Sequence, residues 1–397
     1  MSKTRFKTLN MLSLHDIITS DTRNGAFFMK NNYFTRDISG AIKGIALMLM
    51  FVHHFFTFPE WIICGIDYAW IRTFADQFAA PTKLCVALFA FFTGYFHVFS
   101  AGTLRRSVRK IVDFLLSYWL VCAVLIGAAL AMGCYTLSKA GLVFELLGLQ
   151  TTVMVFCWYV GFFCVIQIML PLLCRQSSTS PVRDVLAILV LPLLCLCILA
   201  EQEFEPILST LILNMQKWYP CAAVGCLFGK YDLFQKWLEP ILNHANRPSL
   251  REKLLPVILV WLAFRGRYYI DQLNLGSIRF RSYDCPIVFP AEAIYAPIFL
   301  FGAANLLTRF RGSLGVRVLE KIGEHSMLMW FYHCFFFGNC GKVTQLLLYW
   351  PRNPVLVFLN GLLMCYLAAA LTEPVRKMVI QVKDRLISRI SGMIPAK

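Results

Sequence analysis

The first long apolar stretch of the chain holds one lysine and two histidines, which are side chains able to bind an anion or move a proton. Lys43 stands near its start, and His53 and His54 follow ten and eleven residues later. On an α-helix, eleven residues rise about 16 Å and turn only ~20° beyond three full turns, whereas ten residues leave His53 about 80° away. We therefore expect Lys43 and His54 to share one face of a helix, with His54 close to the bilayer midplane.

Each of these residue types suggests a role. A desolvated imidazole stays neutral and is the most common general base in enzymes. A lysine at the start of the same helix suits the phosphates of an anionic donor whose reactive end points toward His54. The alternative is a structural histidine that hydrogen-bonds to a neighbouring helix, and the spacing alone does not decide between the two readings.

Further basic residues are candidates, although each has a simpler explanation. Arg106 and Arg109 belong to a basic segment that either anchors the chain at a membrane surface or clamps a diphosphate. Arg265 and Arg267 stand beside two tyrosines, a combination that suits an anionic or glycan acceptor, or they neutralise acidic residues nearby. For His333, a structural role is favoured over a catalytic one.

The elements that must position these residues are helices in a membrane. Of the 397 residues, 58% are hydrophobic and 15% are charged, whereas soluble domains are roughly 45–50% apolar and about 25% charged. This composition argues against a soluble enzyme, a disordered chain, a fibrous protein and a coiled coil. The apolar blocks are long enough to cross a bilayer. We expect an all-α polytopic membrane protein with ten spans at about 42–59, 84–100, 111–132, 153–173, 185–200, 207–228, 254–270, 286–307, 325–340 and 355–371.

The basic residues predict the orientation of these spans. With the N-terminus in the cytoplasm, 28 of the 38 lysines and arginines fall in cytoplasmic segments, in accord with the positive-inside rule. Both termini are then cytoplasmic, and the net charge of +16 indicates contact with membrane lipids rather than a nucleic acid. The predicted parts are a cytoplasmic segment 1–41, a membrane domain 42–371, and a basic amphipathic tail 372–397 on the inner leaflet.

The cysteines do not indicate a metal site. The fifteen cysteines lie mostly inside apolar blocks, without paired CxxC spacing. Buried free thiols are the simplest explanation, and we expect no metal.

The motifs of several spans resemble one known family, the acyltransferase 3 family. Its first helix carries a basic residue, usually arginine, then ten residues and a histidine, and here Lys43 and His54 take these places. Lysine lacks the planar fork of arginine. Further similar motifs follow in the same order as in the family, at Val86–Phe96, Arg106–Arg109, Tyr118-Trp119, Trp158-Tyr159 with Pro171, and Leu319–Ser326 followed by His333.

The resemblance implies an integral membrane O-acyltransferase. Members of the family move an acyl group to a hydroxyl of a glycan, so we expect acyl-CoA, in particular acetyl-CoA, as donor and a cell-surface glycan or its lipid-linked precursor as acceptor. His54 would be the general base or a transient acyl carrier, and Lys43 would hold the donor with help from Arg106 and Arg109. Supporting acceptor-side residues would be Arg265, Arg267 and His333. The expected location is the plasma (inner) membrane.

A different class of function stays open beside this one. Ionisable residues inside apolar spans also line the pathways of transporters. The chain could therefore be a transporter or flippase of an anionic or glycolipid substrate, with His54 and the arginines along its route.

Overall fold

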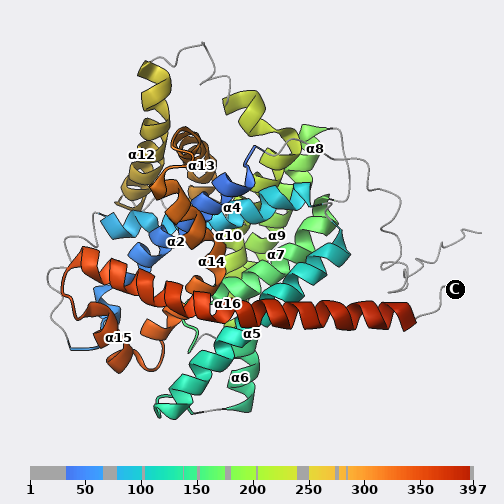
Figure 1. Cartoon of the computed structure of the whole chain (residues 1–397). Helices are drawn as coiled ribbons and strands as arrows, with labels where there is room; N and C mark the ends of the chain where they lie inside the picture. Colours follow the sequence, from blue (N-terminus) through green and yellow to red (C-terminus); the bar gives the residue numbers. More distant parts are fainter. Residues whose placement is uncertain are drawn as a thin grey trace, which may run out of the picture.

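The protein is a bundle of helices in the computed structural model (Figure 1). The structure describes residues 33–65, 78–100, 103–136, 138–149, 153–174, 180–202, 204–238, 250–272, 277–282 and 285–393. Its helices are α2 (Arg36–Phe56), α4 (Leu84–Phe99), α5 (Leu104–Ala131), α6 (Lys139–Leu146), α7 (Trp158–Cys174), α8 (Pro181–Val185), α9 (Leu191–Ala200), α10 (Pro206–Tyr231), α12 (Leu250–Gln272), α13 (Glu292–Arg309), α14 (Leu314–His333), α15 (Gly341–Tyr349) and α16 (Pro354–Met393).

One short hairpin interrupts the helical architecture. Strands β1 (Ser277–Ser282) and β2 (Cys285–Pro290) pair antiparallel, with Ser282 opposite Cys285. The helical fold predicted from composition is therefore confirmed, and this hairpin is the one exception within the described residues. It also corrects the eighth predicted span, because residues 286–290 belong to β2 and the helix starts at Glu292.

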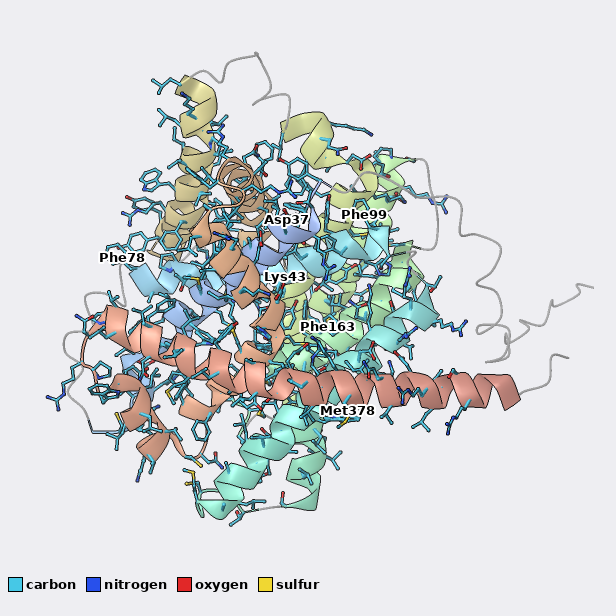
Figure 2. The ribbon with its side chains drawn as sticks, viewed as in Figure 1. Asp37, Lys43, Phe78, Phe99, Phe163 and Met378 are labelled. Carbon is cyan, nitrogen blue, oxygen red and sulfur yellow. The ribbon has the colours of Figure 1, made fainter. Side chains whose placement is uncertain are left out.

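Two helix pairs form the centre of the bundle, α2 with α14 and α4 with α10. Figure 2 shows Lys43 in the middle of the molecule, with Asp37 and Phe99 toward one end and Phe78 on the opposite side. The start of α2 and the end of α4 thus lie near each other, so the two helices run in opposite directions. The core is apolar and rich in aromatic rings, including Phe34, which packs edge-on against Phe92 and Tyr95.

Glycines allow both central pairs to touch backbone to backbone. A Cβ atom on Gly44 would collide with the carbonyl group of Leu319, and one on Gly323 would collide with the carbonyl group of Gly40. Gly94 and Gly225 allow the same close backbone contact between α4 and α10. Small residues spaced four apart are the usual means by which helices approach closely in membranes, where apolar burial gives little preference for a neighbouring helix over lipid.

Five described helices are long and apolar enough to cross a membrane, whereas ten spans were predicted. They are Arg36–Phe56, Pro81–Phe99, Leu104–Ala131, Pro181–Ala200 and Pro354–Arg389. Each of the other five predicted ranges overlaps a helix, but these helices are shorter or more polar. The number ten and the cytoplasmic termini stay predictions.

The bounds of two further predicted spans were wrong. Helix α2 begins at Arg36 rather than near 42, which puts His54 in its last turn instead of midway along it. Helix α14 begins at Leu314 rather than near 325, because Ser313 accepts a hydrogen bond from the Val316 amide and caps it. Hydropathy alone missed the first turns of α14, whose sequence includes charged residues.

Helix α16 is a single element of 40 residues. At about 1.5 Å per residue it is ~60 Å long, twice the thickness of the hydrocarbon core of a bilayer. Its last part is joined to the start of α5 by ion pairs from Lys383 to Asp113 and from Arg109 to Asp384. The predicted tail therefore continues the last span as one helix through Met393, and α5 braces it. Figure 1 shows this end of α16 projecting past the rest of the bundle.

Replacing Gly44 by alanine tests the contact of α2 with α14. The added methyl group must push the two backbones apart, and such overpacking costs about 1–3 kcal/mol of stability. We expect a clearly lower melting temperature for the purified protein in detergent. Gly127→Ala on α5 is the matched control, because open space surrounds that position. Equal melting temperatures for the two variants would contradict the tight contact.

Candidate functional site

Two histidines from helices distant in sequence meet at one end of the bundle. The His54 Nδ1 atom lies 2.8 Å from the His333 Nε2 atom. His54 stands in the last turn of α2, and His333 is the last residue of α14. We call the end of the bundle that holds them the histidine end.

The seam between α2 and α14 brings these rings together. Both histidines lie ten residues beyond the glycines of the crossing, Gly44 and Gly323. On each helix the residues that face the other helix follow one another at steps of four, three, four and three positions. This spacing keeps side chains facing a neighbouring helix. The two rows are Gly40, Gly44, Leu47, Phe51 and His54 on α2, and Leu319, Gly323, Ser326, Trp330 and His333 on α14.

The hydrogen-bond partners assign protons to particular ring nitrogens. The His333 Nδ1 atom bonds to the Trp330 carbonyl oxygen, which only accepts, so that nitrogen must carry the proton. In a neutral imidazole the Nε2 atom of His333 is then an acceptor, and the Nδ1–H group of His54 donates to it. This chain of bonds leaves the lone pair of His54 on its Nε2 atom.

Aromatic rings hold the pair in one orientation. The Phe156 ring stacks on His54 at 3.9 Å between centroids with an interplanar angle of 7°. His333 stacks on the same ring at 5.3 Å, and Phe51 lies 5.6 Å from His333. The two imidazoles therefore lie nearly parallel to the Phe156 ring, and this stacking limits their rotation.

The neighbouring histidine faces other partners. His53 is buried, and its Nδ1 atom lies 3.0 Å from the Thr57 hydroxyl and 3.5 Å from the Ala79 carbonyl oxygen. Within the described residues, His333 is hydrogen-bonded to His54 rather than to His53. The ring nitrogen of His53 is occupied by local groups, which suits a structural role better than the role of a base.

Lys43 lies on the same helix at a distance from the histidine pair. Its ammonium group is half-buried and lies 6.0 Å from the centroid of the Phe96 ring on α4. The eleven-residue separation places it about 16 Å along the helix axis from His54. The structure therefore puts a cation and an imidazole on one helix, with the cation toward the end opposite the histidines.

Arg106 and Arg109 lie at the end of the bundle where α5 begins, and both have partners. The Arg106 guanidinium donates to the Ser100 carbonyl oxygen at 2.6 Å, and Arg109 pairs with Asp384 at 2.9 Å. Both arginines are exposed. The pairing gives Arg109 a role in bracing α16, so its expected role at a donor site competes with a structural one.

Arg265 and Arg267 have different surroundings despite their proximity in sequence. Arg265 lies over Tyr268 at 4.8 Å from the ring centroid. Arg267 is buried and forms an ion pair of 2.9 Å with Glu292. A buried pair of this kind fixes α12 against α13, and removal of either partner leaves a charge stranded in an apolar interior.

Sequence reasoning placed His333 among the supporting residues, and it missed Phe156 and Trp330. No motif in the sequence indicates that the ring of Phe156 covers His54. For Trp330, the available signal was its position three residues before His333, where a helical carbonyl group can reach the histidine side chain.

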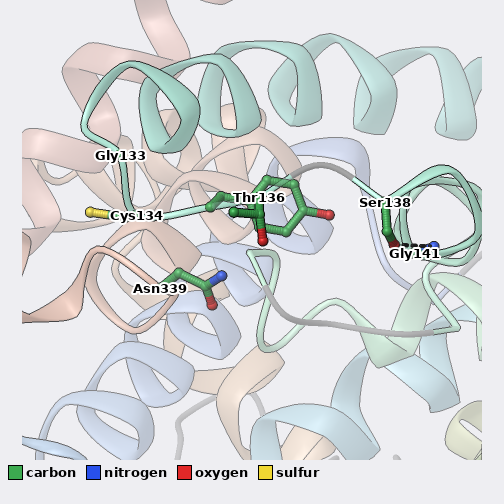
Figure 3. A pocket seen from close by; sticks show the side chains of 7 residues that line it. Gly133, Cys134, Thr136, Ser138, Gly141 and Asn339 are labelled. Carbon is green, nitrogen blue, oxygen red and sulfur yellow. Dashed lines mark hydrogen bonds between the residues drawn. The ribbon is translucent and has the colours of Figure 1, made fainter.

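A polar pocket opens near the histidine end. Its volume is about 280 Å³, and Figure 3 shows Thr136 and Asn339 among its lining side chains. Asn339 follows His333 by six residues. The described residues contain no group of three or more histidine, cysteine, aspartate or glutamate side chains that could hold a metal ion.

Comparison with known proteins gives one match. Residues 39–373 match the acyltransferase 3 family, whose model is that of an acyltransferase domain. No curated protein and no solved structure matches the chain. The match covers most of the chain, including Lys43, both histidines of the pair and all the helices between them. The chain is therefore a multi-pass membrane protein that belongs to the acyltransferase 3 family.

Proposed function

We propose that the protein transfers an acyl group, specifically acetyl, from acyl-CoA to a hydroxyl group of a cell-surface glycan or its lipid-linked precursor. The observation that carries this proposal is the His54–His333 hydrogen bond, which leaves the Nε2 lone pair of His54 free. Membership of the acyltransferase family supports the reaction class. The plasma membrane is the proposed location.

The donor is assigned to the end opposite the histidines. Lys43 would bind a phosphate of CoA as a point charge, with Arg106 as a second cation, and the pantetheine arm would extend along α2 toward His54. The positive-inside distribution of lysine and arginine supports a cytoplasmic location for this end. The histidine end would then face the other side of the membrane, where the acceptor enters.

The proposed chemistry begins at the Nε2 atom of His54. This atom takes the proton of the acceptor hydroxyl while the oxygen attacks the thioester carbonyl carbon. The new carbon–oxygen bond forms, the carbon–sulfur bond breaks, and the CoA thiolate takes the proton back from His54. His333 accepts the Nδ1–H bond throughout and stabilises the imidazolium that forms in between. A route in which Nε2 itself carries the acyl group would start from the same lone pair.

Replacing His54 by alanine tests the role of the base. General-base catalysis is worth roughly 10²–10⁴-fold, so we expect at least about a 100-fold loss of acyl transfer from labelled acetyl-CoA in membrane vesicles. His53→Ala should be milder, because that ring contacts Thr57 and Ala79. If His54→Ala keeps more than about a tenth of the activity at equal protein level, the base has been misassigned. Retained translocation of a glycolipid without acylation would favour a transporter.

His333 is a positioning residue, and its variants test the tautomer argument. His333→Phe removes the acceptor for the Nδ1–H group of His54, and we expect a loss of about 10–100-fold in kcat with little change in KM. His333→Gln keeps an acceptor oxygen and should recover part of the rate. Equal losses in the two variants would show that the ring acts through packing alone.

Lys43 variants test donor binding. We expect Lys43→Arg to bind acyl-CoA at least as well as the unmodified protein, because guanidinium adds a second hydrogen bond to phosphate. Lys43→Gln should weaken binding by roughly 10–150-fold through loss of one charge-assisted contact. Equilibrium binding in detergent measures both, with the exposed Lys321→Gln as control. Equal affinities for all four proteins would leave Lys43 without a donor role.

A further inference from the structure

Three cations and one carboxylate gather near His53 at the end of α2, each from a different element. Lys83 ends the short helical turn Ala80–Lys83, Lys217 lies in α10, Arg267 lies near the end of α12, and Glu292 begins α13. Lys83 is within electrostatic range of the other three. We call Lys83, Lys217 and Arg267 the cation cluster.

The single carboxylate is already engaged. Glu292 forms its 2.9 Å ion pair with Arg267, and the two side chains are 1% and 5% exposed. Lys83 and Lys217 interact electrostatically, and their like charges repel each other. Lys217 also lies 5.4 Å from the centroid of the Trp218 ring. Glu292 therefore balances one of the three cations, and two positive charges remain.

Such an excess is unfavourable in this environment. Both lysines are half-buried within a membrane protein, where a cation usually pairs with an anion or lines a substrate path. Glu292 is the carboxylate that acts most strongly on Lys83, and within the described residues neither Lys83 nor Lys217 forms an ion pair. An external anion would remove the repulsion between Lys83 and Lys217. The cluster is thus better suited to bind an anion than to stabilise the protein by itself.

The cluster lies next to the reacting atoms of the proposed mechanism. Lys83 is within electrostatic range of both His53 and His54, and the whole cluster is within range of His53. Lys43, which is assigned to the donor, stands on the far side of His54 along α2. An anion on the cation cluster would therefore belong to the second substrate, the acceptor.

We propose that the cation cluster binds a phosphate group of the acceptor, so that the substrate is a phosphate-bearing, lipid-linked saccharide. This inference rests on the proposed function. Two net positive charges match a dianionic phosphate or diphosphate, whereas a sugar carboxylate supplies one negative charge. Lysine ammonium groups bind phosphate as compact point charges, with three donors each. Binding at this place holds the saccharide hydroxyl near the Nε2 atom of His54.

Equilibrium binding of farnesyl diphosphate to the purified full chain tests the proposal directly. We expect it to bind more tightly than farnesol, which lacks the phosphates. Lys83→Gln and Lys217→Gln should each weaken binding of farnesyl diphosphate by about tenfold or more. Lys83→Arg keeps the positive charge and should bind farnesyl diphosphate about as well as the unmodified protein. Lys342→Gln removes an exposed lysine on α15 and is the matched control. Arg267 is left in place, because its removal strands Glu292.

Two further measurements separate the possible outcomes. Glucose 1-phosphate competing with farnesyl diphosphate would assign the site to a phosphate on the saccharide, and failure to compete would assign it to the lipid-linked diphosphate. Equal affinity of the unmodified protein and both glutamine variants for farnesyl diphosphate would overturn the phosphate site. Acyl transfer is assayed separately, so charge-dependent diphosphate binding without acyl transfer would overturn the proposed function and leave the site standing.

Discussion

Gly44 and Gly323 let the backbones of α2 and α14 touch, and the geometry of the site depends on this contact. A helix pair that meets without side chains between its backbones has little freedom to slide or rotate. Ten residues further along each helix, this restraint positions two imidazole rings so that they form a 2.8 Å hydrogen bond. A rigid scaffold of this kind suits a proton-transfer group, because small errors in position reduce catalysis strongly.

A second contact, at the end of α14, determines which ring nitrogens of the two histidines carry protons. Because His333 ends α14, its ring can reach back to the Trp330 carbonyl group, and that bond fixes the proton on Nδ1. The Nε2 atom of His333 must then accept the hydrogen bond from the Nδ1–H group of His54. The lone pair of His54 consequently lies on its own Nε2 atom. One backbone carbonyl group therefore determines which ring nitrogen of His54, on a different helix, keeps its lone pair.

The sequence allowed part of this site to be predicted. The helical fold and the family follow from long apolar blocks and the Lys43–His54 spacing, which are local patterns. The partnership of His54 with His333 could not be read in the same way, because it joins residues 279 positions apart and depends on how two helices cross. The bounds of α2 were wrong for a related reason: hydropathy detects apolar residues, whereas a helix also continues through polar ones.

The distribution of charge gives the proposed reaction a physical rationale. Lys43 lies toward one end of α2, and the cation cluster lies beside the stacked rings of Phe156, His54 and His333 toward the other end. An anion held at either end would have to shed its hydration to pass these rings, which is costly in a low-dielectric interior. In the proposed reaction the transferred acyl group is uncharged and small, so it would pass between the two ends while the proposed anionic donor and acceptor stay where they bind. This distribution of charge is the physical argument for the proposed group transfer rather than for transport of a whole anionic molecule.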